Sequence, residues 1–131
     1  MSDPTSVVKT FVHLLQLGKM AEATAMLSPN VVIHHNTRLP YKGFYRGRQG
    51  FAQLLEKIGA FWETFIPGEG TQHIRDEDGV VIIGKLSGKP RHVPDTISVR
   101  VLERYEVDNG QIVAIWPFYI DTHLSDEQAR G

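Results

Sequence analysis

Hydrophobic residues recur with a helical period near the start of the chain. They fall every three or four positions within residues 7–15 and again within 20–27, and Gly18 separates the two stretches. This spacing places apolar side chains on one face of a helix, and glycine is a frequent helix stop. Asp3 and Pro4 suit the start of the first helix, because aspartate caps helices and proline is tolerated in their first turn. The pattern therefore predicts two short amphipathic helices.

The most regular helical pattern covers residues 51–65. Its apolar stripe consists of Phe51, Leu54, Leu55, Ile58, Phe61, Trp62 and Phe65. Spacing of this kind is typical of a helix that buries one face. Glycines within 47–50 precede the stripe and Pro67-Gly68 follows it. We therefore expect a third helix over 51–65.

Strand patterns occupy the rest of the chain. Residues 31–36 alternate, a short extended piece surrounds 44–45, and from residue 70 onward the period is two. The later strands are expected at 71–75, 80–86, 96–107 and 111–121, with turns at Asp78-Gly79, 87–90 and Asn109-Gly110. Helix, helix, strand, short strand, helix and four antiparallel strands predict an α+β domain, with its helices on one face of a bent antiparallel sheet.

One histidine of the first strand is aimed at the interior. Because side chains alternate along a strand, Val31, Ile33 and His35 share one face and His34 lies on the other. A histidine in an apolar interior can carry acid–base chemistry near neutral pH. The alternative is a core histidine whose ring nitrogens are satisfied by the backbone or by Asn36.

A carboxylate interrupts the apolar face of the longest strand. Glu103 lies in the row formed by Val99, Val101, Tyr105 and Val107. A carboxylate in such a row is either partnered or has a raised pKa, and perturbed groups of this kind gather at functional sites. Alternatively, Glu103 binds a buried histidine or tyrosine, or lies at a bulge and faces water.

Composition narrows the function classes. The 131 residues, 41% hydrophobic and 22% charged, suit one globular domain spanning 1–131. Its ordered core is expected at about 4–124, with a flexible polar tail at 125–131. The chain has no cysteine, which excludes disulfides and thiolate chemistry. A net charge of −1 disfavours nucleic acid and membrane partners, and the lack of a leader-like or spanning segment favours a cytoplasmic location.

The six histidines do not form a metal motif. His34 and His35 point to opposite faces, and none of the others has the i, i+4 spacing of helical zinc ligands. No cofactor motif is present either. We therefore expect neither a metal nor a cofactor.

Several short segments follow one another in a particular order: Phe11-x6-Gly18, 26–31, Tyr45-Arg46-Gly47, 108–112 and Tyr119-Ile120-Asp121. Together they resemble the nuclear-transport-factor-2-like superfamily, which includes ketosteroid isomerases and SnoaL-like polyketide cyclases. The resemblance implies a cone-shaped, curved antiparallel sheet wrapped around three N-terminal helices. It implies no single activity, because this superfamily uses one pocket for several kinds of enzyme and for binding proteins.

The resemblance also assigns roles to residues. The general base of ketosteroid isomerases falls on His35, their protonated second acid on Glu103 and their helical tyrosine on Phe11. Histidine and phenylalanine depart from that pattern, which disfavours steroid isomerisation but leaves proton transfer possible. SnoaL-like cyclases have a catalytic acid near the end of the last strand, which matches Asp121. The alternative role of Asp121 is to cap a turn.

These assignments lead to three hypotheses about one pocket. The residues expected to line it are Phe11, Trp62, His73, Val101, Tyr105, Ile115 and Tyr119. In the first, a small apolar or carbonyl-containing ligand binds, His35 abstracts a proton beside the carbonyl, and neutral Glu103 donates a hydrogen bond to the oxyanion. In the second, the chain is a binding or assembly module and its own aromatic side chains fill the pocket. In the third, His35 and Asp121 activate water in a hydrolase or dehydratase.

Trp116 and Phe118 form a second apolar face on the last strand. Such a face on an antiparallel sheet is usually covered. In the superfamily that this chain resembles, the cover is a second subunit, so we expect a homodimer.

Overall fold

The computed structural model describes residues 3–119, and for residues 67–71 it describes the backbone alone. Its elements are α1 (Pro4–Gln16), α2 (Met20–Ala25), β1 (Leu27–His35), β2 (Gly43–Arg46), α3 (Gly47–Phe61), β3 (Trp62–Arg75), β4 (Gly79–Pro90), β5 (Ile97–Asp108) and β6 (Gln111–Tyr119). The order of helices and strands is the predicted one, and the α+β class is confirmed. Asp121 and the expected tail at 125–131 lie outside the described residues.

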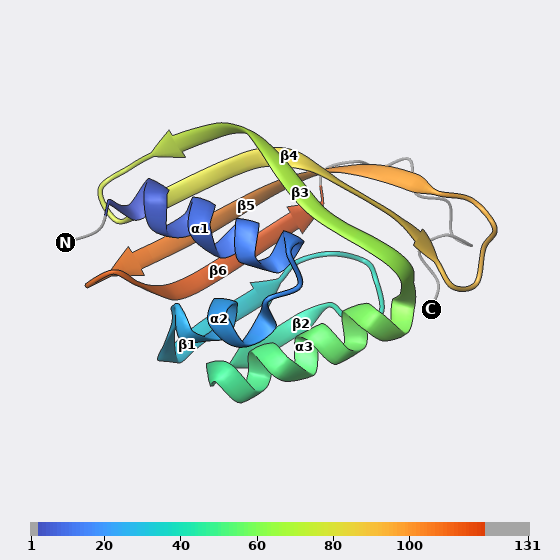
Figure 1. Cartoon of the computed structure of the whole chain (residues 1–131), viewed down its shortest axis with the longest axis horizontal. Helices are drawn as coiled ribbons and strands as arrows, with labels where there is room; N and C mark the ends of the chain where they lie inside the picture. The colour runs from blue at the N-terminus through green and yellow to red at the C-terminus, as the bar shows by residue number, and fades with distance from the viewer. Residues whose placement is uncertain (1–2, 120–131) are drawn as a thin grey trace.

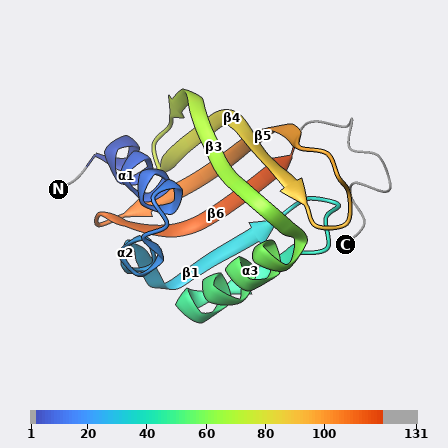
Figure 2. The same ribbon diagram turned by 45° about the vertical axis from the view of Figure 1, so that its right-hand side comes forward.

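The six strands form one curled sheet in the order β2-β1-β6-β5-β4-β3 (Figure 1). It is antiparallel, as predicted, except between β1 and β6, which run parallel. A parallel neighbour needs a long crossover, and here the crossover is the whole stretch of chain from β2 to β5. The three helices lie on one side of the sheet, and the long strand β3 curves past them (Figure 2).

Helix α1 begins and ends where its sequence indicates. The carboxylate of Asp3 accepts a hydrogen bond of 3.2 Å from the N–H of Ser6, which caps the first turn. Pro4 occupies the first helical position. Gly18 follows the helix with a φ of 75°, a conformation that glycine adopts without strain. These two ends fix where the helix crosses the sheet.

Helix α3 is shorter than predicted at its far end. It stops at Phe61, and Trp62 and Phe65, which continue the helical stripe in the sequence, belong to β3. Trp62 pairs with Pro90 and Phe65 with Gly88, so pairing with β4 outweighs the local helical pattern. Both residues are aromatic, a class that strands favour.

The turn expected at 87–90 is also absent, because β4 runs straight through these residues to Pro90. Gly88 pairs with Phe65 on one side and with Ile97 on the other. A Cβ atom at this position would lie 2.2 Å from the carbonyl oxygen of Thr64. Glycine is therefore needed here for the close approach of β3, and it does not mark a turn.

The predicted strand faces hold in β1 and β5. Val31, Ile33 and His35 are buried and His34 is exposed, and Val101 and Tyr105 are buried on either side of Glu103. In β6 the register shifts by one residue, since Glu106 pairs with Ala114 but Val107 with Ile112. The bulge brings Ile112, in place of the expected Val113, to the inner face.

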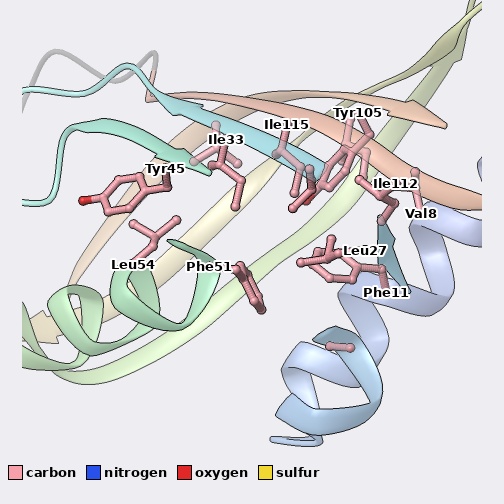
Figure 3. Packing of buried hydrophobic residues seen from close by; sticks show 14 of the residues in the cluster. Val8, Phe11, Leu27, Ile33, Tyr45, Phe51, Leu54, Tyr105, Ile112 and Ile115 are labelled. Carbon is pink, nitrogen blue, oxygen red and sulfur yellow. The ribbon is translucent and has the colours of Figure 1, made fainter. Parts of the chain in front are cut away.

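The inner face of the sheet and the helices share one hydrophobic core (Figure 3). Val8, Leu27 and Ile112 are fully buried in it. No helix within residues 3–119 is long and apolar enough to cross a membrane.

Candidate functional site

A cavity of about 430 Å³ lies between the helices and the inner face of the sheet. The helical wall of this cavity consists of Phe11, Val12, Leu15, Met20, Phe51, Leu54, Leu55, Ile58 and Gly59. The wall from the strands consists of Ile33, His35, Phe65, Leu86, Val101, Glu103, Tyr105, Ile115, Pro117 and Tyr119. Figure 3 shows side chains from α1, α3 and the sheet projecting toward one another around this space. A volume of this size is typical of small-molecule pockets.

Seven of the residues singled out in the sequence line this cavity: Phe11, His35, Val101, Glu103, Tyr105, Ile115 and Tyr119. Two others, Trp62 and His73, are not among the residues that line it. Trp62 is buried beside the cavity, where its indole N–H donates to the hydroxyl of Tyr41 at 3.0 Å. His73 lies on β3 opposite Ile82, and partial burial together with the ammonium of Lys9 lowers its pKa.

His35 lies at the end of β1, buried with 5% of its surface exposed. Its ring packs edge-on against Tyr41 and Tyr119, at centroid distances of 4.9 and 5.4 Å. Burial lowers its pKa from 6.5 to about 4, so the ring is neutral at pH 7. Its Nδ1 is buried and has no hydrogen-bond partner among the described residues.

The missing partner bears on which ring nitrogen carries the proton. A buried N–H without an acceptor is a rarer defect than a buried acceptor without a donor. The arrangement therefore favours the tautomer of His35 in which Nε2 is protonated and Nδ1 is bare. In that form the ring is a neutral hydrogen-bond donor.

Sequence reasoning missed Tyr41, which is fully buried in the loop between β1 and β2. Its hydroxyl accepts from Trp62 and shares a 2.6 Å hydrogen bond with the hydroxyl of Tyr119. Its carbonyl accepts from the hydroxyl of Tyr45 at 2.8 Å. Burial raises the pKa of Tyr41 to about 12, against the effect of its hydrogen bonds. The only signal in the sequence is an aromatic residue between Pro40 and Gly43, without any periodicity.

Glu103 lies in the middle of β5, and the part of its surface that is exposed borders the cavity. Burial raises its pKa from 4.5 to about 7, although a hydrogen bond from Tyr105 acts in the opposite direction. The hydroxyl of Tyr105 donates to Oε1 of Glu103 at 3.3 Å. Near neutral pH this carboxyl group is therefore divided between its acid and its base form.

The sheet register places His35 and Glu103 at one level. Glu103 pairs with Pro117, and the N–H of Asn36, next to His35, donates to the carbonyl of Pro117 at 3.2 Å. Strands lie about 4.8 Å apart, so the backbones of the two residues are separated by about 10 Å, with β6 between them. Their side chains border the same cavity, and a ligand over Pro117 can lie between them.

Polar groups are confined to one wall of the cavity. His35, Glu103, Tyr105 and Tyr119 all come from the sheet, whereas the residues contributed by the helices are apolar. The residues that line the cavity include no lysine or arginine. Across the described part of the chain, no group of three or more His, Asp or Glu side chains is arranged to hold a metal ion. The polar side chains of the cavity therefore lie along one wall of an otherwise apolar lining.

Comparisons with known proteins agree with this geometry. A model of the SnoaL-like domain family matches residues 8–115. By sequence, no curated protein matches the chain. An NTF2-like protein from Burkholderia thailandensis is similar in structure, with a TM-score of 0.83 and 22% identity over 91% of this chain and 92% of that one.

Two further solved structures are similar over nearly their whole length. A protein from Xanthomonas campestris with a cystatin-like fold has a TM-score of 0.86 and 21% identity, over 99% of this chain and 100% of that one. A protein from Catenulispora acidiphila with a ketosteroid isomerase-like fold, solved in complex with trimethylamine, has a TM-score of 0.77 and 14% identity over 94% and 91%. At these identities the likeness shows the fold alone.

Proposed function

The chain belongs to the SnoaL-like domain family, and on that premise we propose that it transfers a proton within a small neutral ligand held in the cavity. The observation that carries the proposal is the pairing of two perturbed groups, His35 and Glu103, along one wall of an otherwise apolar pocket. Pairs of groups whose environments shift their pKa values apart are characteristic of acid–base sites.

Glu103 is the better proton acceptor of the two. Its pKa of about 7 lies near the operating pH, where a general base is most effective, whereas a pKa of about 4 makes His35 a weak base. In the proposed step the carboxylate of Glu103 takes a proton from the carbon beside a carbonyl group. The C–H electron pair moves into the enolate, and Glu103 later returns the proton to the ligand carbon.

His35 then acts as the electrophile. As a neutral donor through Nε2 it stabilises the negative charge that develops on the carbonyl oxygen. This exchanges the roles expected from the sequence, in which His35 was the base and Glu103 the donor. Burial causes the exchange, because it weakens histidine as a base and strengthens glutamate as one.

The lining indicates the ligand class. With no cationic side chain on its walls, the cavity disfavours carboxylates and phosphates, and its helical wall suits an apolar ring or chain. A volume of about 430 Å³ also argues against a pocket filled by its own aromatic side chains. The trimethylamine bound to the Catenulispora acidiphila protein supports the use of this fold as a small-molecule site.

The test is hydrogen–deuterium exchange of a probe ketone. We expect the protein to accelerate exchange of the α-protons of 2-tetralone in D2O, followed by NMR. Glu103→Gln should lower the rate by about 100-fold, the usual size of a general-base contribution. Glu106→Gln, on the same strand but the opposite face, is the matched control and should leave the rate unchanged. Equal rates for wild type and Glu103→Gln would falsify the catalytic role, and binding of 2-tetralone without exchange would favour a binding protein.

We also propose that a second copy of the chain covers the outer face of the sheet. Phe118 is 36% exposed there and pairs with half-buried Leu102, next to half-buried Trp116. Sedimentation of the wild type should give a dimer, and Phe118→Asp a monomer. Leu17→Asp, at a residue 54% exposed beyond α1, should leave the dimer intact. A monomeric wild type would overturn this proposal and leave the pocket chemistry untouched.

A further inference from the structure

The cavity wall formed by α3 becomes more exposed toward the end of the helix. Phe51 and Leu54 are buried, Leu55 and Ile58 are half-buried, and Gly59 is exposed. All five border the cavity and follow one helical stripe at i, i+3, i+4, i+7 and i+8. The C-terminal end of α3 therefore lies at the mouth of the cavity.

The part of the helical wall formed by α1 and α2 shows the same gradient. Phe11 is buried, Val12 and Leu15 are half-buried, and Met20 is 39% exposed. These residues belong to α1 and to the start of α2 (Figure 2). Met20 and Gly59 are the two exposed residues among those that line the cavity, so we place its mouth at these two residues.

The backbone does not require glycine at position 59. The residue is inside α3, which continues to Phe61, and its φ is not in the left-handed region. Its carbonyl accepts a 3.0 Å hydrogen bond from Nε of Arg91, which holds this turn in place. A Cβ atom added here would meet no atom within 4 Å. Glycine is nevertheless the least favourable residue inside a helix apart from proline.

We infer that Gly59 keeps the mouth open and sets the size limit of the ligands that the cavity accepts. The inference rests on the proposed function, since it assumes that the cavity holds a ligand. A side chain at position 59 would continue the stripe of Leu55 into the mouth, where Met20 also lies. Ligands enclosed by the cavity would still fit, whereas uncharged compounds whose apolar body reaches past Ile58 would meet it.

The experiment compares two neutral fluorescent probes of different length, 2-naphthol and N-phenyl-1-naphthylamine, by titration at pH 7. Gly59→Trp should weaken the longer probe by about tenfold or more and the shorter one by about threefold or less. Gly59→Ala should change neither affinity by more than about twofold, because a methyl group meets open space.

Ala60→Trp provides the matched control. Ala60 is the next residue of α3, is exposed and does not border the cavity, so this variant should bind both probes like the wild type. Thermal unfolding of each variant verifies that it is folded. Gly59→Leu repeats the test with a smaller side chain if Gly59→Trp does not fold.

The outcomes separate the two proposals. If the wild type binds both probes and Gly59→Trp binds them equally well, or loses both to the same extent, Gly59 does not set the size limit and this inference fails alone. If the wild type binds neither probe at micromolar concentration, the cavity is not a site for neutral ligands, and the proposed function fails together with it.

Discussion

The polar side chains on the sheet wall, which we call the polar row, are His35, Tyr119, Glu103 and Tyr105. Burial shifts the pKa values of His35 and Glu103, which lie on β1 and β5 at its two ends, in opposite directions. At the β1 end, His35 is enclosed by aromatic rings, and its pKa falls to about 4. At the β5 end, Glu103 borders the cavity, and its pKa rises to about 7. One group thus loses a positive charge and the other a negative charge, for the same physical reason: an apolar surrounding penalises charge of either sign.

This difference shows how the cavity stays close to neutral while it keeps two titratable groups. A matched ion pair would offer a ligand two strong charges. Here a neutral imidazole and a carboxyl group near its midpoint offer a donor and an exchangeable proton instead. The two ends also differ in their neighbours. At the β1 end the hydroxyl of Tyr41 is hydrogen-bonded to both Trp62 and Tyr119, whereas Glu103 has Tyr105 alone among the side chains whose bonds are described.

The largest expected effect comes from removing the charge at the β5 end. Glu103→Gln should stabilise the protein by about 3 kcal/mol at pH 8 and leave its stability unchanged at pH 4. The folded pKa of about 7 exceeds the usual 4.5, so Glu103 contributes stability below pH 4.5 that is lost as the pH rises through 7. Urea unfolding at the two pH values measures this, and equal effects at both would contradict the raised pKa.

The next largest effect on stability should come from breaking the hydrogen bonds that join Trp62, Tyr41 and Tyr119 at the β1 end. Tyr41→Phe leaves the N–H of Trp62 without its acceptor and should destabilise the protein by about 2 kcal/mol. Tyr45→Phe removes a single hydrogen bond, the one to the carbonyl of Tyr41, and should destabilise by about 1 kcal/mol. Urea unfolding of both variants compares them, and a smaller loss of stability for Tyr41→Phe than for Tyr45→Phe would show that the bonds of the Tyr41 hydroxyl stabilise the fold no more than a single hydrogen bond does.

The contributions of His35 and Glu103 to the pH dependence of stability should cancel in the wild type. Below pH 6.5 the unfolded chain protonates His35 before the folded protein does, so this group lowers stability as the pH falls toward 4. Glu103 acts in the opposite sense between pH 7 and 4.5. On acidification from pH 6.5 to 4.5, the free energy of unfolding of His35→Gln should therefore rise relative to wild type by about 1.4 kcal/mol per pH unit. That of Glu103→Gln should fall relative to wild type by about the same amount. Parallel curves for the three proteins would show that the two shifts are absent.

The smallest effect concerns the partner of Glu103. The hydrogen bond from Tyr105 lowers the pKa of the carboxyl group, so Tyr105→Phe should raise that pKa by less than one unit. The midpoint of the pH profile for ketone exchange reports it. A midpoint that moves to lower pH would mean that Tyr105 does not donate to the carboxylate.

The residues of the polar row could be read from the sequence because each lies in a regular strand. Alternation alone places His35 beside Val31 and Ile33, and Glu103 between Val101 and Tyr105, on inner faces. The exchange of chemical roles that we propose for His35 and Glu103 could not be predicted in this way. It depends on how tightly the rings of Tyr41 and Tyr119 enclose His35 and on the burial of Glu103, which are properties of the packed molecule.

Where the sequence pattern failed to predict the structure, the cause is a contact between segments that are distant along the chain. Trp62 continues a helical stripe but joins β3, since β4 offers it a partner in Pro90. Gly88 looks like a turn residue but is needed where β3 and β4 approach closely. Tyr41 has no pattern at all, because a loop residue has no period and its partners, Trp62 and Tyr119, come from β3 and β6.

The parallel seam between β1 and β6 has a consequence for how the chain acquires its structure. Ile33 pairs with Ile115, so β1 has to wait for β6, which is made later, before the two strands can pair. Contacts between segments so distant along the chain slow folding and leave an apolar edge unpaired in the meantime. Until β6 emerges from the ribosome, His35 and Glu103 belong to separate pieces of sheet. The cavity therefore forms only after β6 has been made, and a chain that ends before β6 would lack it.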